Sequence, residues 1–527
     1  MAAGLWQQGT RQQALARLQQ TFDVVVIGGG ITGAGIALEG ARRGLKVLLL
    51  EQRDFAWGTS SRSSKLVHGG LRYLKQGALH LTRESVVERQ QLLRDAPGLI
   101  QPQSFAFADY PQRKPGKLLL NAGLMVYDLL AGKRTRQYDA ADEFLMYAPH
   151  IDRAQLRGGS HLYGRQNRRR TTGVARVAGS GRPRRHPAQL RAPARQLLRD
   201  GQQVTGVQLQ DALSGEPYQV RARAVVNATG AWADILRGEV QAKPMLRPLR
   251  GSHLLLPFWR LPVAQAISFM HPADGRPVFL YPWEGVTLVG TTDLDHSDLE
   301  NEASISRAEV DYLLQALQYQ FPDMQLGDAD ILSTYAGVRP VVNTGKADPS
   351  AEGRDHVVLL ENGLLTVTGG KLTTFRVIAL DVLAKLRALL PDWPANLQPS
   401  PIFAPVSATP SGLPANIHAR LWGRYGNSTP ALLAVAEADE LHTIGATDVV
   451  WAELRWAARF EGVAHLQDLL LRRTRLGLTC ARGAAEFLPR IGAIVCAELG
   501  WDEARWASEQ KNYLALIQRC YSVPAAI

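Results

Sequence analysis

The sequence predicts an α/β fold in three parts: a Rossmann-like domain, a domain built on an antiparallel sheet, and a C-terminal helical domain. The first part is indicated by a strand, a glycine-rich turn and a helix within residues 23–51. Short apolar strands between turn residues recur from 250 to 295 and predict the antiparallel sheet. From residue 415 onward apolar residues recur at helical spacing. A chain of 527 residues has room for two or three such domains.

The glycine-rich turn has the pattern GxGxxG, formed by Gly28, Gly30 and Gly33. The first glycine permits a tight turn, the second lets a pyrophosphate approach the backbone, and the third lets helix and strand pack closely. Glu51 ends the next strand, near the spacing expected for the acid that binds a ribose hydroxyl. The helix N-terminus favours the diphosphate. These features predict an adenine dinucleotide site and leave NAD and FAD as alternatives.

Three later segments carry residues suited to ligand contact. Residues 59–74 combine small hydroxyl side chains and paired glycines with histidine, arginine and tyrosine, which favours a loop pressed against a ligand over an ordinary serine-rich loop. The strand 217–226 runs into Ala-Thr-Gly at 228–230, a second point where backbone meets a dinucleotide. Residues 368–374 open a helix after a strand, and Leu372 excludes a Walker A loop because Ser or Thr is needed there.

The chain order suggests where the parts begin and end. We expect an N-terminal helix or extension at 1–21 and a dinucleotide-binding domain at 22–390 that is interleaved with a substrate domain. The substrate part is expected at about 100–220 and 245–340. Seven prolines between 391 and 414 predict a linker, and 415–527 is the expected helical domain.

Composition narrows the function classes. The net charge is +12, but it falls to +2 without the ten arginines of residues 165–195. The positive charge is therefore concentrated in one segment, which argues against a nucleic-acid-binding surface spread over the molecule. Three cysteines, all near the C-terminus, indicate a reducing compartment and no disulfide framework. The histidines are too widely spaced for an HExxH-type metal site. Residues 1–20 lack the apolar core of a signal peptide, and we expect a cytoplasmic protein.

An apolar segment with basic ends covers residues 114–134 and predicts a helix of about four turns. It is too short to span a bilayer. Two interpretations stay open, a helix of the core and a helix that lies in a membrane interface with its lysines at the headgroups.

The motifs together resemble the FAD-dependent glycerol-3-phosphate dehydrogenases of bacteria and mitochondria. The matching stretches are GGGITGAG with Glu51, TSSRSSKLVHGGLRYL at 59–74, NATGAW at 227–232, RGSHLLLP at 250–257, GTTD at 290–293, GVRP at 337–340 and GGKLTT at 369–374. The stretches 453–462 and 468–478 look like the C-terminal domain of that family. The resemblance implies FAD as cofactor, oxidation of sn-glycerol 3-phosphate to dihydroxyacetone phosphate, and membrane quinone as electron acceptor.

The resemblance also implies site residues. The substrate phosphate is expected on Arg72, Tyr73, Arg339 and Lys371, since arginine forks bind phosphate bidentately and lysine adds a charge. His68 and His253 are the candidates for the catalytic base, and Asp293 is a candidate for orienting substrate or flavin. The expected FAD contacts are Gly28, Gly30, Thr32, Gly33, Glu51, Thr59, Ser60, Ser61, Lys65, Ala228, Thr229, Gly230, Gly370, Leu372 and Thr373. No metal is expected, and a homodimer is one of the oligomeric states left open.

Residues 165–195 depart from the resemblance, because an arginine run stands where the family has an acidic, helix-forming stretch. Two compensating frame changes in a GC-rich gene would explain a foreign segment between matching flanks. A genuine insert is one alternative, and an RNA-binding arm is another, though the run lacks the aromatics typical of such arms. We expect this segment to be irregular and exposed.

Three rival functions remain at this point. One is an oxidase with the same fold and substrate that uses oxygen. Another is a flavin amine or amino-acid oxidase, which needs an anchor for carboxylate in place of phosphate. The third, a nucleic-acid-binding protein, depends on the arginine run alone.

Overall fold

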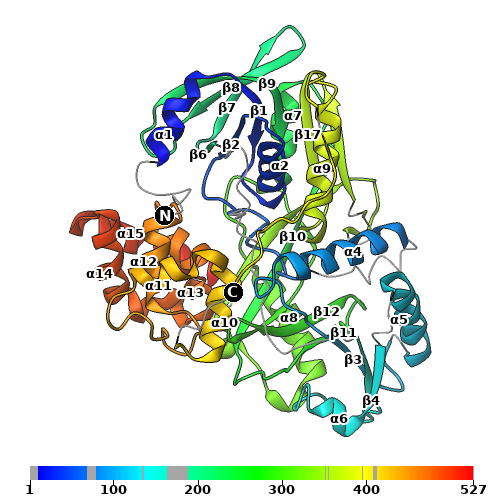
Figure 1. Ribbon diagram of the computed structural model, residues 1–527. Coiled ribbons are helices and arrows are strands. Elements are labelled where there is room, and N and C mark those ends of the chain that lie inside the picture. The colour runs from blue at the N-terminus through cyan, green and yellow to red at the C-terminus, as the bar shows by residue number, and fades with distance from the viewer. Residues whose placement is uncertain are drawn as a thin grey trace.

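The computed structural model describes residues 10–67, 79–114, 116–132, 136–162, 188–349, 352–353, 355–394, 396–407 and 412–525. Within these residues the chain forms two β-sheets, each with its own helices, and a group of C-terminal helices packed beside them (Figure 1).

The first sheet has its central strands in parallel, in the order β16-β17-β9-β1-β2-β6, and β8 and β7 continue from the first half of β9. β1 lies between β9 and β2, with Val25 opposite both Val225 and Leu48. The central strands of a parallel sheet are buried on both faces, and residues 24–27 and 47–50 are accordingly apolar and buried. The strands are β1 (Phe22–Ile27), β2 (Val47–Glu51), β6 (Ala188–Arg191), β7 (Ala194–Asp200), β8 (Gln203–Gln210), β9 (Pro217–Asn227), β16 (His356–Glu361) and β17 (Leu364–Gly369).

The helices of this part include two that pack against each other on one face of the sheet. Gly35 on the first approaches Phe375 on the second so closely that a Cβ at Gly35 would lie 2.9 Å from the Phe375 ring. Glycine is therefore needed here for helix packing. The helices are α1 (Thr10–Ala16), α2 (Ile31–Arg42), α7 (Ala233–Glu239) and α9 (Phe375–Leu386), and the close pair is α2 and α9.

The second sheet is mostly antiparallel, in the order β14-β10-β13-β12-β11-β3-β5-β4, and β15 pairs with β10 along its whole length. The strands are β3 (Phe105–Asp109), β4 (Arg136–Ala140), β5 (Gly158–Leu162), β10 (Leu246–Pro257), β11 (Ala266–Met270), β12 (Pro277–Trp283), β13 (Val286–Gly290), β14 (Leu294–Asp295) and β15 (Ser333–Val342). The accompanying helices are α4 (Leu79–Asp95), α5 (Lys117–Ala131), α6 (Ala141–Leu145) and α8 (Arg307–Gln320).

The C-terminal helices share a hydrophobic core with the second sheet. Tyr281, Trp283 and Tyr335 of the sheet pack in one cluster with Leu454 and Leu470 of the helices. The helices are α10 (Ala415–Tyr425), α11 (Thr429–Val435), α12 (Trp451–Phe460), α13 (Leu476–Thr479), α14 (Leu488–Leu499) and α15 (Glu503–Leu516), with π-helical turns at Asp468–Arg473 and Ile517–Tyr521.

Two predictions about residues 188–220 need correction. This segment was assigned to the substrate part, but its strands β6, β7 and β8 belong to the first sheet, where β6 pairs in parallel with β2. The end of the arginine run, 188–195, was expected to be irregular and exposed, yet it enters β6 and β7, and Leu190 and Arg191 are buried. The free edge of β2 supplies hydrogen-bond partners that composition does not reveal. Residues 163–187 lie outside the described residues.

The apolar helix predicted at 114–134 is α5, which buries one face in the protein and exposes the opposite face. Leu124 and Tyr127 are buried in a cluster with Val86 of α4. Leu118 and Leu129, on the other side, are 88% and 81% exposed. Among the described residues, no helix is both long enough and apolar enough to cross a bilayer.

Candidate functional site

Three glycines shape the turn from β1 to α2. Gly28 has a φ of 112°, and a side chain there would collide with the carbonyl oxygen of Ala228. A Cβ at Gly33 would collide with the Gly28 carbonyl. Gly30 is the N-cap of α2, and only the Ser60 hydroxyl, at 3.2 Å, lies near an added Cβ. The space beside Gly30 at a helix N-terminus fits a diphosphate.

Glu51 stands at the carboxyl end of β2, beside this turn. Its carboxylate accepts hydrogen bonds from the backbone N–H of Gly29 at 2.8 Å and of Arg53 at 2.9 Å. Burial raises the pKa of the carboxyl, and these backbone donors oppose the rise. A carboxylate oxygen accepts more than one hydrogen bond, so Glu51 retains capacity for ribose hydroxyls.

The loop after β2 brings its hydroxyl side chains against the same turn. The Ser60 hydroxyl accepts from the first N–H of α2, at Ile31, over 2.9 Å. Thr59 donates to the carbonyl of Val338 on β15 at 2.5 Å, and Ser61 donates to a carbonyl within the loop at 3.2 Å. The loop is therefore fixed both to the dinucleotide turn and to the second sheet.

Lys65 lies in this loop, but its side chain is turned into the protein. The ammonium donates to the Ser61 carbonyl and lies 4.5 Å from the ring centroid of Tyr335 and 5.2 Å from that of Trp283. Burial and then the charge of Arg475 hold the pKa of Lys65 well below its usual value. The side chain anchors the loop, which leaves its backbone for contact with a dinucleotide.

A second backbone approach lies at the end of β9. The N–H of Ala228 donates to the end of β1 at 2.8 Å, and Thr229 donates its hydroxyl to Asn227 at 2.7 Å. Gly230 has a positive φ, and its carbonyl accepts from Thr368 at 3.3 Å. This bond joins the Ala-Thr-Gly turn to the end of β17. The loop after β17 carries the other predicted contacts, Gly370, Leu372 and Thr373.

The second sheet contributes a buried histidine. His253 on β10 contacts the Ser64 hydroxyl through Nε2 at 2.8 Å and stacks on Tyr335 at 4.6 Å between ring centroids. A side chain at Gly290 would collide with its ring. Burial, then Arg339 and Lys65, hold its pKa well below the usual value. His253 has no exposed surface, so in this structure it contacts protein groups and not solvent.

Arg339 lies next to this histidine, in a fixed position on β15. It donates to the Asp293 carboxylate at 2.8 Å, to the Thr292 carbonyl at 3.2 Å and to the Thr291 hydroxyl at 3.0 Å. Its guanidinium lies over Gly251, where a Cβ would collide with it. The sequence motifs GTTD and GVRP therefore meet, through contacts that neither motif reveals alone.

Lys371 is the other described residue of the predicted phosphate site, and its ammonium lies 3.4 Å from the Ser85 hydroxyl on α4. Three predicted site residues lie outside the described residues: His68, Arg72 and Tyr73.

Two supporting residues were missed from the sequence. Ser64, the partner of His253, stands inside the TSSRSSKLVHGGLRYL motif. Glu309 accepts hydrogen bonds from Ser252 at 2.8 Å and from Thr292 at 2.6 Å, and so holds the loop on which Arg339 rests. The capping-box spacing from Ser306 to Glu309 indicates the start of the helix. It does not indicate that Glu309 also binds Ser252 and Thr292.

The arrangement provides a dinucleotide cradle at the carboxyl ends of parallel strands and a fixed cation beside a histidine. Ligands of α/β sheets bind at such strand ends. The described residues include no group of three or more His, Cys, Asp and Glu that could hold a metal ion.

Comparisons with known proteins agree with this geometry. The FAD dependent oxidoreductase family matches residues 23–376, and the C-terminal domain of alpha-glycerophosphate oxidase matches residues 392–506. The aerobic glycerol-3-phosphate dehydrogenase of Staphylococcus haemolyticus is 33% identical over 86% of this chain and 87% of its own length. Glycerol-3-phosphate dehydrogenase 2 of Mycobacterium tuberculosis is 35% identical over 97% of this chain and 91% of its own length.

A solved structure repeats the architecture. The glycerol-3-phosphate dehydrogenase from Bacillus halodurans, complexed with FAD, superimposes with a TM-score of 0.76 at 24% identity and covers 98% of this chain and 99% of its own. The fold, the glycine cradle and the family matches lead to one assignment. The chain belongs to the FAD-dependent glycerol-3-phosphate dehydrogenase family and uses FAD as its cofactor.

Proposed function

We propose that this protein oxidises sn-glycerol 3-phosphate to dihydroxyacetone phosphate. FAD, bound between the glycine turn, Glu51 and the Ala-Thr-Gly turn, would accept the hydride from the carbinol carbon. The names of the relatives support the substrate. The observation that carries the proposal is the guanidinium of Arg339, which three residues at 291–293 hold in place. Its strand, β15, also contacts the FAD-binding loop, residues 52–67, through Thr59.

Arg339 is the proposed anchor for the substrate phosphate. A guanidinium has five N–H donors, so it can retain Asp293 and bind phosphate oxygens at the same time. Its fixed position lowers the entropy lost when substrate is oriented. Lys371, Arg72 and Tyr73 are proposed to complete the anchor from separate loops.

The general base is proposed to be His68. Of the two histidines considered from the sequence, His68 lies outside the described residues, and the His253 side chain is fully enclosed by protein. A base must come within hydrogen-bond reach of the proton that it removes. His253 is better suited to hold Ser64 and the loop in place.

The substrate assignment can be tested with Arg339→Ala. Losing a hydrogen bond to a charged group should cost about 2–3 kcal/mol of transition-state stabilisation. The kcat/KM for glycerol 3-phosphate should therefore fall roughly 30- to 150-fold. The FAD content, read from the visible spectrum, should not change. Arg247→Ala is the matched control, since Arg247 forms a similar pair with Asp295 on the adjacent strand but outside the site. Wild-type kcat/KM in Arg339→Ala would remove this residue from the phosphate site.

The electron acceptor is proposed to be a membrane quinone. The support is the exposed apolar face of α5, which suits contact with lipid, where quinones reside. The alternative is an oxidase that uses oxygen. Substrate-reduced enzyme, kept free of oxygen, should be reoxidised rapidly by a water-soluble quinone analogue and slowly by later addition of air. The reverse order of rates would identify an oxidase.

A further inference from the structure

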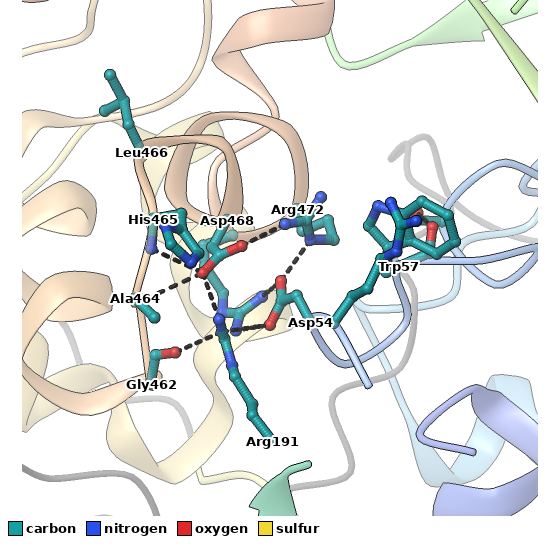
Figure 2. A network of polar contacts seen from close by, with 12 residues as sticks. Asp54, Trp57, Arg191, Gly462, Ala464, His465, Leu466, Asp468 and Arg472 are labelled. Atoms are coloured by element: carbon teal, nitrogen blue, oxygen red, sulfur yellow. Dashed lines mark hydrogen bonds and ion pairs between the residues drawn. The ribbon is translucent and has the colours of Figure 1, made fainter. Parts of the chain in front are cut away.

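A buried cluster of charges lies directly behind the FAD-binding loop. Asp54 follows Glu51 by three residues and is 2% exposed. Its carboxylate accepts one hydrogen bond from Arg191 at 2.5 Å, two from Arg473 at 2.8 Å each, and one from Arg472. Figure 2 shows the Asp54 carboxylate between Arg191 and Arg472.

The arginines come from two distant parts of the chain. Arg472 and Arg473 end a π-helical turn of the C-terminal domain, and Arg191 ends β6, the strand next to β2. Asp54 thus forms part of the contact between the first and the last thirds of the sequence. Because the carboxylate is buried against three cations, it cannot move away without taking from Arg473 the carboxylate that pairs with it and leaving Arg191 and Arg472 to share Asp468.

A second carboxylate closes the network from the C-terminal side. Asp468 accepts from Arg191 at 2.7 Å and from Arg472, and it also accepts the backbone N–H groups of Ala464 and His465 at 3.0 and 2.9 Å (Figure 2). Arg191 in turn donates to the Gly462 carbonyl at 2.7 Å. The network therefore connects β6 to a segment of the C-terminal domain whose own backbone it fixes.

The charges of this cluster are stable at neutral pH. Burial alone would raise the pKa of Asp54, but Arg473, Arg472 and Arg191 overcome this and hold it well below the usual range. The same loop has a second attachment, because Arg62 donates to the Tyr521 hydroxyl at 3.1 Å and pairs with Glu302.

The loop held in this way carries groups that are bonded to the glycine turn and to the start of α2. Ser60, six residues after Asp54, accepts from the first N–H of α2, and Glu51, three residues before it, accepts from the glycine turn. A loop fixed before binding loses less entropy when a ligand arrives. Nothing else in the described loop between Glu51 and Ser60 is bound to the C-terminal domain by an ion pair of this kind.

We propose that Asp54 is a positioning residue through which the C-terminal domain holds the FAD-binding loop, so that tight retention of FAD depends on this domain. Asp54 does not contact the substrate. It acts through Glu51 and Ser60, whose positions it fixes from behind.

The test is the rate at which full-length holoprotein releases FAD. After dilution, the fluorescence of released FAD should rise at least tenfold faster in Asp54→Asn than in the wild type. The matched control is Glu440→Gln, because Glu440 is also buried and accepts two hydrogen bonds from Arg455 at 2.9 and 2.7 Å, but within the C-terminal domain. This variant should lower the unfolding temperature and leave FAD release within twofold of wild type.

Two outcomes would overturn the proposal. One is release of FAD from Asp54→Asn at the wild-type rate, and the other is equally fast release from Glu440→Gln, which would indicate general destabilisation. If Asp54→Asn does not fold, Arg473→Gln replaces it, since Asp54 then keeps two of its three arginines. Release about threefold faster than wild type is expected there, and an unchanged rate contradicts the proposal.

Discussion

His253 shows how the site controls the charge of a single residue. Its imidazole is enclosed by Tyr335 and Ser64, and the positive charges of Arg339 and Lys65 face it. A protonated ring would add a third cation to a buried space. The folded protein therefore keeps His253 neutral at pH values where an unfolded chain would protonate it.

This difference predicts a pH dependence of stability. Between the lowered folded-state pKa and the unfolded value of 6.5, the unfolded state binds more protons, so the free energy of unfolding falls as the pH drops below 6.5. His253 contributes at most one proton, or about 1.4 kcal/mol per pH unit. Urea unfolding of wild type and His253→Asn from pH 7.5 to 5 measures the contribution. The wild-type curve should be steeper, and parallel curves would show that His253 is not held neutral.

At the residue scale, the sequence predicts those roles that depend on local backbone. Gly28 and Gly33 occupy positions where a side chain would collide with the adjacent turn, and their spacing alone indicates this. Lys65 shows the limit. Its motif predicts contact with the cofactor, but it does not reveal that the Lys65 side chain lies on Tyr335 and Trp283. These two residues are more than 200 positions away in sequence.

Among the elements, α5 has an unusual distribution of apolar side chains. One face belongs to a small core with α4, while the opposite face exposes a group of large apolar residues. That group is Leu118, Leu119, Met125, Val126 and Leu129. An apolar face without a protein partner among the described residues, on a helix that begins with Lys117, fits the headgroup boundary of a membrane.

The double variant Leu118→Gln with Leu119→Gln tests this face. Each leucine loses most of the transfer free energy gained in lipid, so binding to phosphatidylglycerol vesicles should weaken about tenfold or more. Cosedimentation with vesicles is the measurement. Ile235→Gln, at an exposed position on α7, is the control and should bind as wild type does. Leu124 is unsuitable because it is buried. Equal binding by all three proteins would exclude α5 as the contact.

At the element scale, the sequence predicts helices and strands well where their apolar residues recur with a strong period. It predicts them poorly where pairing with a distant segment determines the conformation. β6 has only four residues, Ala-Gln-Leu-Arg, at the end of the arginine run. Its strand conformation comes from pairing with β2 and from burial of Leu190 and Arg191, not from any local pattern. The proline-rich segment is predicted to be a linker, and its sequence does not reveal that its carbonyls at Pro401 and Asn396 accept from arginines of α2 and its C-cap.

In the whole molecule, the C-terminal helices are not an independent body. They share one apolar cluster with the second sheet and one ionic cluster with the FAD-binding loop. Sequence periodicity predicts that helices are present, but it does not reveal these contacts, because the groups involved lie hundreds of residues apart. The C-terminal domain is therefore part of the structure that surrounds the site.

This organisation predicts how the molecule responds to acid. Three buried carboxyls at this interface, on Asp54, Asp468 and Glu284, have pKa values below their usual range, because the charges of nearby arginines outweigh the effect of burial. The same holds for Glu453 within the C-terminal helices. Since the folded state binds fewer protons than the unfolded state there, their contribution is present above the unfolded pKa of about 4 and is lost as the pH falls below it.

Contacts of the C-terminal domain should consequently loosen before the apolar first sheet unfolds. Hydrogen exchange between pH 6 and 3, corrected for the intrinsic effect of pH, can follow both regions. Protection should fall first in residues 52–67 and 453–475, while β1 and β9 stay protected because apolar burial does not titrate. FAD release should accompany the early loss, since opening of the loop that carries Ser60 lets Asp54 bind a proton, which favours the open loop as the pH falls below about 4. Simultaneous loss of protection in all these segments would mean that the ionic cluster does not control the contact.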